Sequence, residues 1–114
     1  LQLYHIPPTE QIIEKRLSDR EVKTVAQFPI SAGKKRFRID LAILCNRGNI
    51  AIECDNYKAH SSKIQIHKDR IKDKTLRKLG WRVFRLSEKE ILEKLDRVAD
   101  RIEKRVHILG NVRN

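Results

Sequence analysis

Apolar residues recur at helical spacing in three segments of the chain. The first predicted helix runs from Glu10 to about Asp19, where the apolar side chains fall on one side. A second begins after Ser62, for which Gln65 is placed to complete a capping box, and ends at Gly80. The third begins after Ser87, and its apolar residues recur at intervals of 4, 3 and 4: Ile91, Leu95, Val98 and Ile102. The pattern therefore predicts three helices.

Strand-like segments lie between these helices. Residues Val22 to Ile30 alternate loosely, and the turn-forming residues Ser31 to Lys34 follow, which predicts a strand and a hairpin loop. Phe37 to Cys45 and Ile50 to Cys54 are more continuously apolar, and the short turn between them predicts a second hairpin. A fourth strand, Trp81 to Leu86, gives the order α-β-β-β-α-β-α. We therefore expect an α/β fold in which helices flank a mixed four-stranded sheet.

The composition is typical of one globular domain. With 114 residues, of which 39% are apolar and 36% charged, the chain is long enough to bury one core. No apolar run approaches the roughly 20 residues that span a membrane, and no signal peptide is recognisable. Cys45 and Cys54 lack the spacing of a zinc site, so we expect buried, reduced thiols. Because the chain starts at Leu1 and holds no methionine, we expect residues 1–114 to be a single domain from a longer protein.

The chain is strongly basic: 26 Lys and Arg residues against 15 Asp and Glu give a formal net charge of +11. The excess is concentrated: residues Val22 to Ile39 hold five basic residues and no acid, and Lys63 to Arg85 hold nine against two acids. A polyanionic partner, above all nucleic acid, is therefore expected. The alternative is that these are solvated faces of ordinary helices. The residues that we expect to contact DNA phosphates are Lys34, Lys35, Arg36, Arg38, Lys63, Lys68 and Arg70.

Acidic residues interrupt the two most apolar strands. Asp40 lies within the segment from Phe37 to Cys45, and Glu53 and Asp55 lie at the end of the next strand. A buried carboxylate needs a counter-charge, a hydrogen-bond partner or a metal ion. Because two adjacent strands deliver acids to one region, and hard oxygen ligands suit Mg²⁺ or Mn²⁺, we expect a metal site there.

An alternative interpretation is that Asp40 and Glu53 form structural ion pairs with arginines. Arg38, Arg82 and Arg85 are the candidates for that network.

The order of these residues resembles the core signature of the very-short-patch-repair-like nucleases. This branch of the PD-(D/E)XK superfamily includes the EDxHD homing endonucleases. The residues that carry the resemblance, from about Thr9 to Ile102, are Glu10, Gln27 with Pro29, Asp40, the run Ile52-Glu53-Cys54-Asp55-Asn56, His60, Asp69, Asp73, Leu76 and Gly80 to Arg85. Two departures matter: Asn56 stands where the branch has Gly, and Asp55 stands where the superfamily has its lysine. At the position of Asp55, this branch commonly has Asp.

The resemblance implies a restriction-endonuclease-like fold and one divalent metal ion, Mg²⁺ or Mn²⁺. Asp40, Glu53 and the backbone carbonyl of Cys54 would bind the ion, which lowers the pKa of an attacking water. His60 would act as general base or orient that water. Asp55 and Asp69 would be outer or alternate ligands. Glu10 would orient the site, with Glu14, one turn later, as the alternative.

Three functions remain open on the sequence. The first is a metal-dependent DNA endonuclease domain of homing, repair or restriction type, the second an inactive basic nucleic-acid-binding module, and the third a structural domain. For the first we expect DNA as partner, cytoplasmic location in a bacterial or phage-infected cell, and no membrane. We also consider a homodimer, and expect a further DNA-recognition domain in the full-length protein because no base-reading motif is present.

Overall fold

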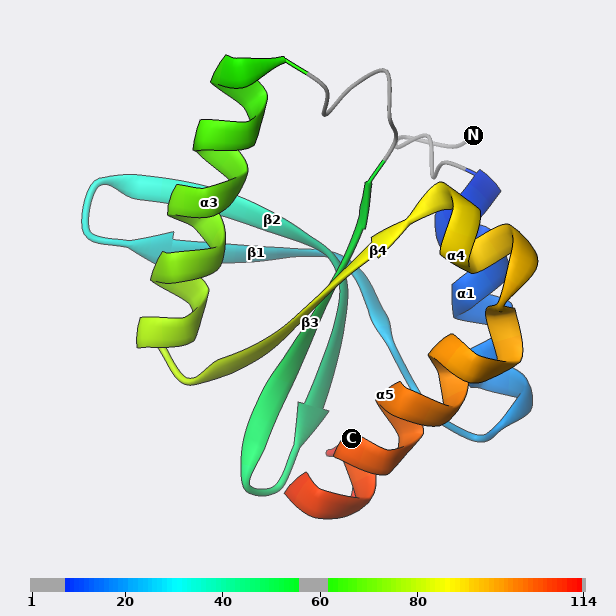
Figure 1. The fold of residues 1–114 in the computed structure, drawn as a ribbon. Coiled ribbons are helices and arrows are strands. Elements are labelled where there is room, and N and C mark those ends of the chain that lie inside the picture. Colours follow the sequence, from blue (N-terminus) through cyan, green and yellow to red (C-terminus); the bar gives the residue numbers. More distant parts are fainter. Residues whose placement is uncertain (1–7, 56–61, 114) are drawn as a thin grey trace, which may run out of the picture.

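Helices and strands alternate along the computed structural model, which describes residues 8–55 and 62–113 (Figure 1). In chain order the elements are α1 (Pro8–Asp19), β1 (Val25–Ala32), β2 (Lys35–Cys45), β3 (Gly48–Asp55), α3 (Lys63–Lys78), β4 (Trp81–Ser87), α4 (Glu88–Glu93) and α5 (Leu95–Leu109). No helix in the described ranges has the length and apolarity needed to cross a membrane.

The four strands form one mixed sheet in the order β1-β2-β3-β4. Strands β1 and β2 pair antiparallel, as do β2 and β3, whereas β3 and β4 run parallel. A parallel neighbour requires a crossover, and α3 provides it on one face of the sheet. The predicted fold class, a mixed four-stranded sheet flanked by helices, is therefore confirmed.

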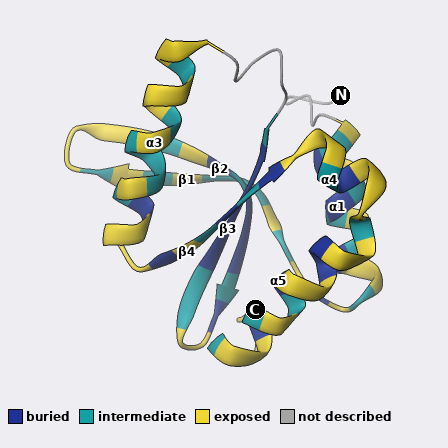
Figure 2. Cartoon of the chain, viewed as in Figure 1, coloured by how far each residue is buried: buried dark blue, intermediate teal, exposed yellow. Residues whose placement is uncertain are grey.

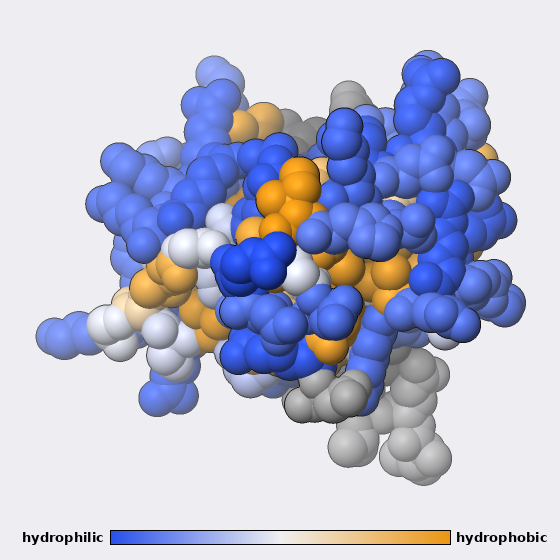
Figure 3. Space-filling model, turned by 90° about the horizontal axis from the view of Figure 1, so that it is seen from below, coloured by the Kyte–Doolittle hydropathy of each residue, from blue (hydrophilic) through white to orange (hydrophobic). Residues whose placement is uncertain are grey.

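The sheet separates two apolar clusters, and Figure 2 shows the dark, buried residues concentrated on the strands and the inner sides of the helices. The larger cluster packs α1, α4 and α5 against one face, with Ile13, Ile52 and Ile102 fully buried. The smaller lies under α3, where Leu76 is the buried residue of that helix. Hydrophilic side chains cover most of the face in Figure 3, with apolar patches between them. The helix α3 is thus held by fewer apolar contacts than the helices opposite.

Three local predictions were wrong. The final helix is divided at Lys94, whose ψ of 39° leaves helical geometry, so that α4 and α5 pack in different directions. The first strand begins at Val25 rather than Val22, whose amide donates to the carbonyl of Leu17 and whose side chain is buried. Ser62 does accept a hydrogen bond from the Gln65 amide, but the Gln65 side chain donates to Asp69 and leaves that capping box half formed.

Candidate active site

Asp40 and Glu53 lie where strands β2 and β3 separate. The ladder between these strands ends at the pair Leu41 and Ile52, so Asp40 and Glu53 occupy the next register position. Their carboxylates take over the backbone amides that the ladder no longer satisfies. Glu53 Oε2 accepts a hydrogen bond from Asp40 N at 3.1 Å, and Asp40 Oδ2 accepts one from Cys54 N at 2.9 Å. The strand divergence therefore brings the two predicted acids together and fixes one oxygen of each.

Polar residues occupy neighbouring register positions on all four strands. Gln27 lies opposite Asp40, between the paired positions on either side, and Glu53 pairs with Arg85 on β4. Gln27 has a φ of 52°, a left-handed conformation that is unfavourable for a residue with a β-carbon. Its side-chain amide donates to Glu10 Oε2 at 3.3 Å. Backbone strain in β1 thus accompanies a contact with the first helix.

Glu10 is buried, with 4% of its surface exposed, and it lines the same pocket as Asp40 and Glu53. Burial and the neighbouring Asp40 raise the pKa of Glu10 to about 7. Glu14 is partly exposed and lies outside that pocket. Of the two candidates on the first helix, the structure therefore places Glu10 beside the strand acids.

Glu53 is the most deeply buried acid of the described residues, with 2% of its surface exposed. Burial and the charge of Asp40 raise its pKa to about 7, and Lys72 on α3 opposes this shift. The Lys72 ammonium forms an ion pair with Glu53 Oε1 and donates its hydrogen bond to the carbonyl of Arg38. Among the described residues, Glu53 Oε1 is a buried oxygen without a hydrogen-bond partner. The Lys72 ammonium is therefore the group that balances this oxygen.

A second group of acids surrounds Arg85. Its guanidinium donates to both oxygens of Asp73, at 2.5 and 3.0 Å, and to Asp55 at 2.5 Å, while Asp69 lies 3.9 Å away. Bidentate pairing of this kind satisfies the carboxylates. The expected structural ion pairs therefore form around Arg85, but they engage Asp55 and Asp73 rather than Asp40 and Glu53.

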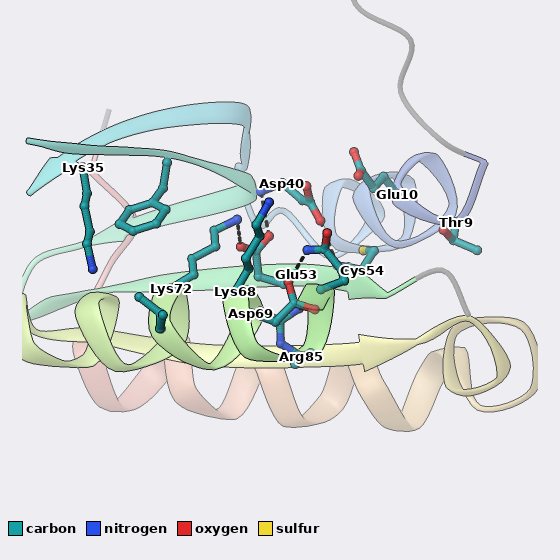
Figure 4. Close-up of a pocket in the computed structure, with 13 residues that line it drawn as sticks. Thr9, Glu10, Lys35, Asp40, Glu53, Cys54, Lys68, Asp69, Lys72 and Arg85 are labelled. Carbon is teal, nitrogen blue, oxygen red and sulfur yellow. Dashed lines mark hydrogen bonds and ion pairs between the residues drawn. The ribbon is translucent and has the colours of Figure 1, made fainter. Parts of the chain in front are cut away.

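A slot of about 610 Å³ lies between α3 and the strands β2 and β3 (Figure 4). Its lining residues are Thr9, Glu10, Lys35, Phe37, Asp40, Glu53, Cys54, Gln65, Lys68, Asp69, Ile71, Lys72 and Arg85. The predicted site residues Glu10, Asp40, Glu53 and Asp69 thus share one pocket. Asp55 is absent from this lining because it turns to Arg85. His60 lies outside the described residues.

The basic residues expected to contact DNA are all exposed. Lys35 and Lys68 line the slot. The other five lie on the β1–β2 hairpin and on α3: Lys34, Arg36, Arg38, Lys63 and Arg70. Both segments border the slot, so positive charge flanks the carboxylates on two sides.

The donor set suits a hard cation, although no cluster of three or more metal-ligating side chains is assembled in residues 8–55 and 62–113. Two carboxylates meet there, and Glu53 Oε1 is held by its ion pair with Lys72, which a bound cation would have to share or replace. Burial, followed by the charges of Asp40 and Glu10, raises the pKa of the Cys54 thiol far above its usual range. That thiol stays protonated, so Cys54 can contribute only its backbone carbonyl.

Sequence reasoning missed Lys72 as a site residue, because it is one of many lysines on a basic helix. Its spacing offers a signal: Asp69, Lys72 and Leu76 recur at intervals of 3 and 4 and share one face of α3. Leu76 is fully buried against the sheet. A lysine one turn before a buried leucine is directed towards the strands.

One family model matches most of the chain. A family model, REase_MTES_1575, matches residues 10–106, and the chain belongs to this restriction-endonuclease-like family. The match spans α1 to most of α5 and includes every described acid of the site. No curated protein and no solved structure matches the chain significantly.

Proposed function

We propose that this domain hydrolyses phosphodiester bonds in DNA with the help of a divalent metal ion. The observation that carries the proposal is the pair Asp40 and Glu53, which meet where two strands separate and line one slot bordered by lysines. Membership of a restriction-endonuclease-like family supports nuclease chemistry. We further propose the very-short-patch-repair-like branch, on the motif order from Glu10 to Arg85.

Asp40, Glu53 and the backbone carbonyl of Cys54 would hold Mg²⁺ or Mn²⁺. When bound, such an ion supplies Lewis acidity at the scissile phosphate and lowers the pKa of a nearby water. The protein contributes the fixed orientation of the carboxylates, since one oxygen of each is held by a backbone amide. Preorganised ligands avoid the cost of ordering them at the moment of reaction.

Lys72 would supply the positive charge that is missing at Asp55. In the superfamily signature a lysine stands at that position, whereas here Asp55 pairs with Arg85. Lys72 reaches Glu53 from α3, and its side chain is 19% exposed, so its ammonium can also meet a bound phosphate. Lys72 would therefore orient the phosphate beside the carboxylates.

Glu10, held by Gln27, would orient a water molecule or the metal ligands. Asp69 would contribute as an outer residue of the slot, since the Gln65 amide donates to its Oδ1 at 3.0 Å. His60 remains the proposed general base. Asp55 would act indirectly, because its contact is with Arg85.

DNA is the proposed partner, on the net charge of +11 and the exposed lysines and arginines beside the slot. A homodimer, a separate DNA-recognition domain in the full-length protein and a location in the bacterial or phage-infected cytoplasm remain part of the proposal. The alternative is a binding module without catalysis. The Lys72 ion pair favours that alternative, because it already neutralises Glu53.

Cleavage by Asp40→Asn tests the proposal. Wild type is expected to nick or cut plasmid and short linear DNA in Mg²⁺ or Mn²⁺, and Asp40→Asn to lose this activity while retaining its fold. Asp19→Asn is the matched control, because Asp19 forms only a surface pair with Lys15. Undiminished cleavage by Asp40→Asn rejects the proposed site. DNA binding without cleavage by wild type in either ion supports the binding module.

A further inference from the structure

Two apolar side chains line the slot beside its charged residues. Phe37 lies on β2 between Lys35 and Asp40, Ile71 lies on α3, and both side chains are half-buried. Of the aromatic side chains in the described ranges, Phe37 is the one that belongs to neither core cluster. Phe28 and Trp81 pack edge to face, with ring centroids 5.7 Å apart, and Phe84 belongs to the larger cluster. The core therefore does not account for an aromatic ring at position 37.

Positive charge extends along the same slot. Figure 4 places Lys35 at one end of the slot and Glu10 at the other, with Lys72 and Lys68 between them. The side chains of Lys35 and Lys68 are exposed. An occupant that extends along the slot therefore meets cations and an apolar wall as well as Asp40 and Glu53. A single nucleic-acid strand matches both features, because its phosphates pair with cations and its flat bases pack on an apolar wall.

A nucleobase within a duplex cannot place its face on Phe37, because neighbouring base pairs cover both faces. The base must be unpaired already or must leave the stack. The volume of about 610 Å³ lies within the range of about 300–1,000 Å³ that is common for small-ligand pockets. Such a slot accommodates part of one strand rather than a double helix.

We propose that the Phe37–Ile71 part of the slot binds an unpaired nucleobase of the strand whose scissile phosphate lies at Asp40 and Glu53. The substrate class is then single-stranded or locally opened DNA. Phe37 and Ile71 contact the base, and Lys35 and Lys68 hold the phosphates of the same strand. The inference rests on the proposed function for the location of the phosphate, but base binding itself requires no metal and no cleavage.

The test is a binding cycle in EDTA at fixed salt. It compares wild type with Phe37→Leu on a duplex carrying a central bubble, on the same duplex with abasic residues in the bubble, and on the fully paired duplex. Wild type is expected to bind the bubble most tightly. Phe37→Leu is expected to lose roughly 5- to 100-fold affinity for the bubble and little for the paired duplex. Removal of the bases should weaken wild type similarly and should leave Phe37→Leu nearly unchanged.

Two further variants separate stacking from charge and from folding. Phe37→Trp keeps an aromatic face and is expected to keep the bubble preference. Lys35→Ala should weaken binding to all three DNAs and reduce the salt dependence, which Phe37→Leu should leave unchanged. Thermal unfolding of each variant shows whether the fold is retained.

The outcomes separate this inference from the nuclease proposal. Equal losses on bubble and paired duplex, or an unchanged bubble affinity in folded Phe37→Leu, overturn the base site even if Mg²⁺-dependent cleavage is observed. A Phe37-dependent bubble preference supports the base site even if no divalent ion permits cleavage.

Discussion

Glu53 and Asp55 lie two residues apart on the same strand, yet their surroundings differ. Asp55 and Asp73 share one arginine, Arg85, which binds them through directed hydrogen bonds. Glu53 lies deeper, beside Asp40, and one of its oxygens has only an ion pair with Lys72. Directed hydrogen bonds hold the acids of the first group, whereas one oxygen of Glu53 is held by an ion pair that a bound cation would share or replace. Both acids have a counter-charge, so directed hydrogen bonding, rather than position in the motif, distinguishes the structural acid from the candidate ligand.

The largest expected effect concerns catalysis. Glu53→Gln should lower the cleavage rate by roughly 10²- to 10⁴-fold, because a bound cation contributes several kcal/mol at the transition state. Asp55→Asn should lower it far less, since Asp55 contacts Arg85 rather than the slot. Single-turnover cleavage of the same DNA measures both rates. A greater loss in Asp55→Asn would reverse the assignment of the two groups.

Arg85→Met should have the largest effect on stability. It removes the guanidinium that binds Asp55 and Asp73, whose side chains are only 26% and 13% exposed. The free energy of unfolding should fall by about 2–3 kcal/mol at pH 7.5, somewhat less than for a fully buried pair. Urea unfolding measures this difference.

Lys72→Met is compared with Arg85→Met by the same urea unfolding measurement. Glu53 can take up a proton when Lys72 is lost, because its pKa is already near 7. The destabilisation should therefore be smaller than in Arg85→Met and should nearly vanish at pH 5.5. An equal loss in the two variants at both pH values would remove the distinction between the groups.

Stability should also respond to pH through Glu53. Its pKa is about 7 in the folded protein and 4.5 without the surrounding structure, so the folded state binds more protons between these values. The free energy of unfolding should therefore fall as pH rises from about 4.5 to 7, by roughly 1–3 kcal/mol from this group. Metal-free unfolding of wild type and Glu53→Gln measures the contribution as a difference. A difference that is constant with pH would show that burial does not perturb Glu53.

The smallest effect is expected at Gln27. Gln27→Gly removes both the left-handed strain and the hydrogen bond to Glu10, so stability should change little. Cleavage should fall by up to about tenfold, the equivalent of one hydrogen bond. Glu10→Gln should resemble it, whereas Glu14→Gln is the matched control outside the slot. Full activity in Gln27→Gly would mean that Glu10 needs no support.

Much of the fold could be predicted from the sequence, because periodicity reports burial directly. The nearly continuous apolar run from Phe37 to Cys45 predicted the strand that carries Asp40, and the turn before Ile50 predicted its hairpin. The break at Lys94 could not be predicted, since the spacing from Ile91 to Ile102 continues through it. A local pattern does not show where a helix must change direction to pack.

The site was predictable in part for a related reason. Asp40 and Glu53 stand out as acids within apolar strands, and the structure brings them together. The different partners of Asp55 and Glu53 depend on Arg85 and Lys72, which lie 30 and 19 residues further along the chain. Nothing in the local sequence indicates which acid each cation will contact. Sheet register and helix placement determine those pairs.

Calorimetric titration of Mn²⁺ into wild type, Glu53→Gln and Asp55→Asn at pH 7.5 tests the central claim most directly. We predict that wild type binds the ion, that Asp55→Asn retains binding, and that Glu53→Gln loses it. Binding that survives in Glu53→Gln but disappears in Asp55→Asn would contradict the account, as would a wild type that binds no divalent ion.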